Sequence, residues 1–121
     1  MIIDRKIEKY IVYQEDSILR ALEKISANQM RVIFVVNESG TLEGIITDGD
    51  FRRWIVTQQT IDLRGSVSLV ANRNFKYCLI NQRREEIASF FSDKIDHVPL
   101  VDERMHLVAI ACKRQPVICI G

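Results

Sequence analysis

An internal repeat is the feature that most constrains the fold of this sequence. Aligning residue 32 with residue 97, an offset of 65, brings the segment 32–47 onto the segment 97–112 without a gap. The identical pairs are Val36 and Val101, Glu38 and Glu103, Leu42 and Leu107, and Ile45 and Ile110. The same offset aligns Asp16 with Asn81, and both residue types favour helix N-termini. The repeat predicts two similar lobes.

Each copy has the local pattern strand, helix, strand, strand, and the first copy shows it most clearly. A short β-prone run covers 10–13, and a helix is expected after Asp16. The runs 32–36 and 42–47 predict two antiparallel strands, because the loop between them contains Gly40, which tolerates the positive φ of a hairpin turn. A second helix is expected from about residue 48. The apolar residues at helical spacing in the two helices are Ile18, Leu22 and Ile25 with Leu19 beside them, then Phe51, Trp54 and Ile55.

The second copy follows the same plan but stops early. Strands at 77–80, 97–101 and 107–112 and a helix from Asn81 reproduce the first four elements. Pro116 blocks a helix at the place of the fifth element, and β-prone residues follow it to Gly121 at the end of the sequence. We therefore expect the second copy to lack its last helix and the chain to be one segment of a longer polypeptide.

Composition excludes several classes of protein. The chain has 121 residues, enough for one domain or two small units but too few for a catalytic domain plus a separate regulator. Its 17 Lys and Arg balance 16 Asp and Glu, so no overall field would attract nucleic acid or an anionic membrane. The apolar runs are too short for a membrane span, and the charged start is unlike a secretory signal, so we expect a cytoplasmic protein.

The cysteines and histidines do not indicate a metal or catalytic site. The three cysteines lie in apolar surroundings without paired close spacing, which predicts reduced, buried thiols rather than disulfides or zinc ligands. Neither histidine has an acidic or nucleophilic residue at a sequence spacing that would indicate a catalytic site. The residues concerned are Cys78, Cys112 and Cys119, with His97 and His106.

The duplicated pattern of strands and helices, together with the run from Gly44 to Asp50, resembles the tandem cystathionine-β-synthase (CBS) domain pair. The ligand motif of that family is Gly, two apolar positions, Thr or Ser, two variable positions and Asp, which here runs from Gly44 to Asp50. The resemblance covers nearly the whole chain. It implies an α/β fold of two pseudo-symmetric β-α-β-β-α repeats packed through their sheets. The implied parts are a lead-in at 1–9, the first repeat at 10–57, a linker and entry to the second repeat at 58–75, and the second repeat at 76–121.

The motif continues over residues 47–53 as TDGDFRR, and this run narrows the resemblance to one group of CBS pairs. It looks most like CBS pairs attached to enzymes of surface-sugar synthesis: sugar nucleotidyltransferases, sialic-acid-type synthases and arabinose-5-phosphate isomerases. The run 72–75, NRNF, is similar to the first two of these groups. The resemblance implies a non-enzymatic regulatory module whose catalytic domain lies in the same parent chain.

The chemistry of the motif can be argued from the residues themselves. Thr47 ends an apolar strand and the next residues open a helix, so free backbone N–H groups and the helix dipole favour an anion there. The Thr47 hydroxyl can donate to a phosphate or ribose oxygen, and the Asp50 carboxylate can accept from both hydroxyls of a ribose diol. Arg52 and Arg53 would offer planar donor forks to phosphates, whereas Asp48 would repel phosphates unless it points to solvent as a helix cap. These contacts would suit a nucleotide, although the spacing alone favours a structural role for the same residues.

The resemblance adds the identity of the base and of a protein partner. In the family the adenine lies against apolar residues of the first two strands, which implies a hydrophobic slot at Tyr13, Val32 and Ile33. The effector would be AMP, ATP or a similar adenosine-containing nucleotide, with no cofactor and no metal. Paired helices in this family usually form a flat homodimer. The aromatic residues that are candidates for a subunit interface as well as for the core are Phe51, Trp54, Phe90 and Phe91.

A purely structural interpretation stands beside the functional one. Asp48 and Asp50 can serve only to stabilise a helix start, by about 0.3–1 kcal/mol each, and the two arginines can form a solvated helix face. In the second copy, Cys112 stands in place of Thr47 and Gln115 in place of Asp50, so at most one nucleotide site is intact. The alternative hypothesis is a degenerate pair that acts only in dimerisation. A stand-alone enzyme would need a base and a nucleophile together, which the sequence does not offer.

Overall fold

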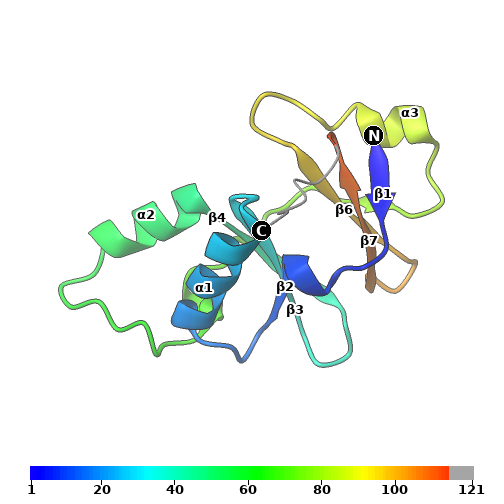
Figure 1. The fold of residues 1–121 in the computed structure, drawn as a ribbon. Helices are drawn as coiled ribbons and strands as arrows, with labels where there is room; N and C mark the ends of the chain where they lie inside the picture. The colour runs from blue at the N-terminus through cyan, green and yellow to red at the C-terminus, as the bar shows by residue number, and fades with distance from the viewer. Residues whose placement is uncertain (115–121) are drawn as a thin grey trace. The chain divides into compact units, whose positions relative to one another are not determined.

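The computed structural model describes residues 1–114 and divides them into two compact units (Figure 1). One unit is formed by residues 8–75, and the other combines residues 1–7 with the chain from residue 76. The predictions that concern residues 115–121, namely the missing last helix, the end of the chain and the third cysteine, Cys119, lie outside the described residues. The predicted repeat boundaries and the packing of the repeats through their sheets stay predictions.

The unit of residues 8–75 contains a three-stranded sheet, two α-helices and two short 3-10 helices. Its elements are η1 (Glu8–Tyr10), β2 (Ile11–Tyr13), α1 (Ile18–Asn28), β3 (Val32–Val36), β4 (Leu42–Thr47), α2 (Asp48–Val56) and η2 (Val67–Leu69). The strand order is β2-β3-β4, with β2 parallel to β3 and β4 antiparallel to β3. The predicted strands 32–36 and 42–47 and their antiparallel pairing are confirmed, and Gly40 in their loop has φ 83°.

The second unit repeats this pairing pattern. Its elements are β1 (Ile2–Asp4), β5 (Cys78–Leu79), α3 (Arg84–Ala88), β6 (His97–Val101) and β7 (Leu107–Cys112), and its sheet has the order β1-β7-β6-β5. β5 is parallel to β6 and β7 is antiparallel to β6, as in the first unit. The predicted strands 97–101 and 107–112 are confirmed. The helix predicted from Asn81 begins only at Arg84, because Gln82 forms a turn that binds the backbone of Leu79.

The predicted helix caps need a correction. The N-cap of α1 is Ser17, whose side chain accepts a hydrogen bond from the backbone N–H of Arg20 at 3.1 Å. Asp16 instead accepts from the backbone N–H of Tyr13 at 2.8 Å and closes the turn between β2 and α1. The N-cap of α3 is Arg83, not Asn81. Asp and Asn bind turn backbone as readily as helix starts, so residue type alone did not separate the two roles.

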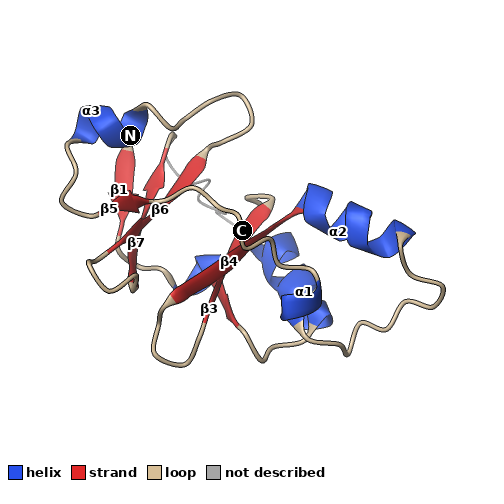
Figure 2. Ribbon diagram, turned by 180° about the vertical axis from the view of Figure 1, so that it is seen from behind, coloured by secondary structure: helices blue, strands red, loops and turns tan. Residues whose placement is uncertain are grey.

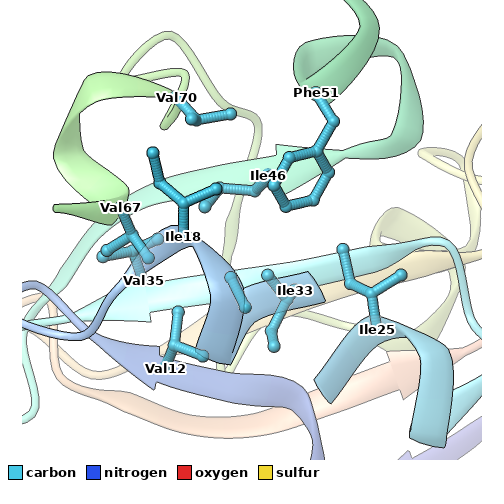
Figure 3. Close-up of a cluster of buried hydrophobic side chains, with 10 residues drawn as sticks. Val12, Ile18, Ile25, Ile33, Val35, Ile46, Phe51, Val67 and Val70 are labelled. Carbon is cyan, nitrogen blue, oxygen red and sulfur yellow. The ribbon is translucent and has the colours of Figure 1, made fainter. Parts of the chain in front are cut away.

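Both helices of the first unit pack on one face of its sheet (Figure 3). Ile18 and Ile25 of α1 and Phe51 of α2 meet Ile33 and Ile46 of the strands in one buried cluster. Burying each large aliphatic side chain stabilises the fold by about 1.5–3 kcal/mol. This cluster therefore fixes the position of α2 against the end of β4. The predicted helical stripes are confirmed at these positions, but two residues assigned to them are exposed instead, namely Leu19 and Ile55.

The segment that precedes each copy joins the sheet of the other copy. In the second unit, β1 pairs antiparallel with β7, and Asp4 lies opposite Ile110. In the first unit, Asn72 forms an antiparallel bridge with Ile45 through two backbone hydrogen bonds of 2.8 and 3.0 Å. Ile45 and Ile110 correspond in the repeat. Each sheet is thus extended at the same edge by a segment that enters the other copy.

Gly44 of the predicted motif lies where this bridging segment passes β4. A Cβ atom at Gly44 would come within 3.2 Å of both the Ala71 side chain and the Asn72 carbonyl oxygen. This distance is shorter than an ordinary van der Waals contact, and one of the two neighbours is backbone. The glycine of the motif therefore has a packing role that is independent of any ligand.

Two further features of the described residues bear on the composition arguments. No helix among them is long and apolar enough to cross a membrane. Cys78 and Cys112 are buried and form no disulfide, and burial raises the pKa of the Cys78 thiol. The prediction of buried thiols is confirmed for these two residues.

A branched side chain at Gly44 should destabilise the first unit. We expect Gly44→Val to lower the free energy of unfolding by about 1–3 kcal/mol, because the added atoms must displace the Asn72 backbone. Urea denaturation measures this change. Thr41→Val, in the hairpin that leads into the same strand, is the control and should change stability much less. Equal stabilities of the two variants would contradict the packing role.

Candidate functional site

The junction between β4 and α2 holds the centre of the candidate site. β4 runs directly into α2 (Figure 2), and Thr47 is both the last residue of the strand and the N-cap of the helix. Asp50 lies in the first turn of α2 with 8% of its surface exposed, and it is the only buried charged residue among those described. A buried carboxylate requires several hydrogen-bond donors around it.

Thr47 and Asp50 form a reciprocal capping box. The Thr47 hydroxyl oxygen accepts a hydrogen bond from the backbone N–H of Asp50 at 3.2 Å. The Asp50 Oδ2 atom accepts from the backbone N–H of Thr47 and from its hydroxyl, both at 2.9 Å. Two backbone donors that the helix start would leave unpaired are thereby satisfied. The structural interpretation of Asp50 as a helix-start residue is confirmed.

Arg53 binds the other oxygen of the same carboxylate. Its Nη2 atom lies 2.7 Å from Asp50 Oδ1, one helical turn along α2. The guanidinium group lies over Gly49, where a Cβ atom would come within 3.3 Å of Nη1. The lack of a side chain at Gly49 therefore leaves room for Arg53. Together with Thr47, this contact places donors on both oxygens of Asp50.

The three predicted slot residues lie in three different places. Val32 lies opposite Thr47 in the β3–β4 pairing and so borders the junction. Ile33 is fully buried in the hydrophobic cluster of the first unit (Figure 3). Tyr13 lies on β2 opposite Val36, at the other end of β3, and Val36 is about 13 Å along the strand from Val32 at about 3.3 Å per residue. The structure thus brings Val32 to Thr47 but does not bring Tyr13 there.

The two arginines of α2 are exposed, and Asp48 is only partly buried. Arg53 contacts Asp50 as described above, whereas Arg52 is an exposed residue on the same helix, and its role as a phosphate ligand stays a prediction. Asp48 is half-buried at the first position of α2, and its backbone N–H donates to the carbonyl oxygen of Arg31 at 3.3 Å. A negative side chain in the first helical turn is favourable because of the helix dipole.

Sequence reasoning missed two cationic residues whose backbone borders the junction. Arg31 is exposed, has φ 63° and accepts from Asp48 immediately before β3. The backbone of Lys9 is joined to the start of β3 by Asn28, whose side-chain amide donates to Lys9 O at 3.1 Å and to Val32 O at 3.4 Å. The only sequence signal was the short polar segment between α1 and β3. It predicts a loop there, but it does not predict which part of the chain the loop contacts.

The second copy repeats one backbone contact of this junction, but a buried thiol replaces the Thr47 hydroxyl. The N–H of Lys113 donates to the carbonyl oxygen of Asp96 at 2.9 Å, which reproduces the contact between Asp48 and Arg31 at the repeat offset. Cys112, in place of Thr47, is buried. The polar capping group of the first copy is therefore replaced by a thiol that donates only weakly.

A cavity of about 290 Å³ lies elsewhere, at the carboxyl ends of β5 and β6. Asp102 on its wall accepts hydrogen bonds from the backbone N–H groups of His106 and Arg104, and its Oδ2 lies 2.9 Å from His106 Nδ1. These bonds, first the one from the His106 backbone, hold the pKa of Asp102 below its usual value. The cavity is lined by Leu79, Ile80, Asn81, Val101, Asp102, Glu103 and Arg104.

Neither place offers a metal centre. The described part of the chain contains no group of three or more His, Cys, Asp and Glu side chains that could hold a metal ion. The chemistry of the β4–α2 junction is instead that of a buried anion, its hydrogen-bond donors and nearby cations.

Comparison with known proteins agrees with this architecture. Residues 5–57 match the family model of the CBS domain. No curated protein matches the chain. Among solved structures, CBSX2 in complex with AMP is 17% identical with a TM-score of 0.75, and the match covers 92% of this chain and 86% of that chain.

Two bacterial structures are similar to the same extent. The CbpB protein of Listeria monocytogenes in complex with c-di-AMP is 21% identical with a TM-score of 0.72, covering 86% of this chain and 80% of that chain. The CBS domains of a transcriptional regulator from Streptococcus pneumoniae are 15% identical with a TM-score of 0.74, covering 92% and 89%. At these identities the similarity establishes the fold.

The hydroxyl of Thr47 should contribute measurably to stability. Thr47→Val keeps the shape of the side chain but removes the acceptor for the Asp50 N–H, so we expect the free energy of unfolding to fall by about 0.5–2 kcal/mol. Thr47→Ser retains the hydroxyl and should lose much less. Urea denaturation of the three proteins measures the difference. Equal losses in the valine and serine variants would show that the capping box is not what stabilises the junction.

Proposed function

We propose that this chain, which has the fold of a tandem CBS domain pair, is a regulatory module that binds an adenosine-containing nucleotide at the β4–α2 junction. The observation that carries the proposal is the Asp50 carboxylate, buried at a helix start beside Thr47 and Arg53. Ribose hydroxyls would replace one of its present donors. Phosphates are attracted by the guanidinium groups of the same helix.

Each part of the ligand has a proposed contact. Asp50 accepts from the ribose hydroxyls, and the Thr47 hydroxyl donates to a ribose or phosphate oxygen. Arg53 and Arg52 bind phosphate. Val32, which pairs with Thr47, is the apolar neighbour that we assign to the adenine. The buried position of Ile33 and the distance of Tyr13 leave Val32 as the strongest of the three predicted slot residues.

The choice of an adenine nucleotide is supported by two proteins of the same fold. CBSX2 was solved with AMP and CbpB with c-di-AMP. Both ligands contain adenine, ribose and phosphate, which are the groups that a carboxylate, an apolar strand and arginines can bind together. The effector proposed for this chain is accordingly AMP, ATP or a related nucleotide.

The proposed consequence of binding is control of a catalytic domain in the same parent chain. The run TDGDFRR at 47–53 favours an enzyme of sugar-nucleotide or sialic-acid-type synthesis, acting in the cytoplasm. Control of this kind requires the nucleotide to bind two arrangements of the protein with different affinity, because equal affinity shifts no equilibrium. The CBS pair itself is not assigned a catalytic step.

Nucleotide binding should raise the melting temperature of the chain. At a ligand concentration one hundred times the dissociation constant, the folded state gains about 2.7 kcal/mol, which corresponds to a rise of several degrees. A melting scan with AMP, ATP and S-adenosylmethionine measures the rise. Asp50→Asn keeps an oxygen for the capping box but removes the negative charge, and Asp50→Ala removes both.

Both Asp50 variants should lose most of the nucleotide-dependent rise, whatever their melting temperature without ligand. A rise of equal size in the variants would reject nucleotide sensing through this carboxylate. The absence of a rise in the unmodified protein with all three ligands would reject the proposed effector class.

A second function, dimerisation without a small ligand, is supported by the apolar end of α2. Val56 is 81% exposed and Ile55 lies beside it with part of its side chain exposed, although Phe51 of the same helix is buried in the core. In addition, Asp50 already has donors on both oxygens. Sedimentation combined with the melting scan separates the two functions, because a dimer indifferent to nucleotides favours this second one.

A further inference from the structure

We infer that Arg53 acts as an internal latch on Asp50 and thereby makes the junction select phosphorylated adenosine over the free nucleoside. The inference rests on the proposed function, since it concerns the same site. It adds a residue that determines specificity and a sequence of events, in which Arg53 leaves Asp50 as the ribose arrives.

The Asp50 carboxylate is already largely occupied by hydrogen-bond donors of the chain itself. Its Oδ2 atom accepts two hydrogen bonds from Thr47, and its Oδ1 atom accepts one from Arg53 at 2.7 Å. A carboxylate offers about four lone-pair positions. A ribose diol brings two hydroxyl donors, so it needs two acceptor positions where one remains. The Thr47 contacts hold the helix start, which leaves the Arg53 contact as the one that can be given up.

The exposure of the two partners points the same way. The Asp50 side chain is 8% exposed, whereas the Arg53 side chain is 71% exposed. Moving Arg53 away from the carboxylate therefore returns an already hydrated group to water. Asp50 cannot move without breaking the capping box. The pair is consequently a fixed anion with a mobile cation.

The position of the guanidinium group after it leaves Asp50 determines which ligand binds more tightly. The guanidinium group lies over Gly49, at the N-terminal turn of α2. A nucleotide that displaces Arg53 from Asp50 can offer its phosphate to that same group. Free adenosine displaces the guanidinium and provides no anion in return. Arg53 therefore opposes nucleoside binding and supports nucleotide binding.

The test compares adenosine and AMP on matched variants of the full chain. Isothermal titration calorimetry gives both dissociation constants for the unmodified protein, for Arg53→Ala and for Arg83→Ala. The control residue Arg83 forms an ion pair of the same spacing with Glu86 at 3.0 Å, on the other unit. Both variants remove one exposed guanidinium group and the ion pair that it forms with a carboxylate one helical turn away, and only Arg53 pairs with the carboxylate of the candidate site.

Arg53→Ala should bind adenosine more tightly and AMP more weakly. The ratio of the adenosine constant to the AMP constant should fall about tenfold, the effect of about 1.4 kcal/mol. Arg83→Ala should leave the ratio unchanged. A ratio unchanged in Arg53→Ala, while both ligands still bind, would overturn the latch and leave the proposed function standing. Absence of binding to every protein would overturn both.

A measurement without ligand tests the latch separately. If Arg53 is held by the Asp50 charge, Arg53→Ala should shift the urea midpoint less in an Asp50→Asn background than in the unmodified background. A smaller shift supports the latch. Equal shifts in the two backgrounds would overturn it even if nucleotides bind.

Discussion

The buried carboxylate of Asp50 is the interaction on which the account of this chain depends. It sits where an apolar strand becomes a helix, and its two hydrogen bonds from Thr47 fix that transition. The apolar cluster beneath holds α2 through Phe51, one residue further along. Because the carboxylate can neither leave nor remain without donors, any change of partner at this point must involve the exposed Arg53.

The features that could be predicted from the sequence are those set by local periodicity. Continuous apolar runs predicted the strands 32–36 and 42–47 at their observed bounds, and Gly40 predicted the hairpin between them. Features set by side-chain geometry could not be predicted in this way. The ion pair between Arg53 and Asp50 depends on helix spacing together with the space above Gly49, and the sequence shows only that both charges are present.

The register between neighbouring strands could not be predicted either, and this limited the prediction of the slot residues. Tyr13 and Val32 both belong to apolar strands, and nothing in their spacing tells how β2 aligns with β3. The parallel register places Tyr13 opposite Val36, at the far end of the strand from Thr47. The loss of the motif in the second copy could be predicted from Cys112. The backbone contact between Lys113 and Asp96 could not be predicted, because main-chain hydrogen bonds do not depend on residue type.

The most direct test of the central claim is to follow backbone amide signals by NMR as AMP is added to the ¹⁵N-labelled chain. If the nucleotide binds at Asp50, the largest concentration-dependent shifts fall on the amides of residues 47–53, around the helix start, and neutralising Asp50 removes these shifts. Saturable shifts confined to the cavity at the ends of β5 and β6, with residues 47–53 unaffected, would contradict the assignment of the ligand site to this carboxylate.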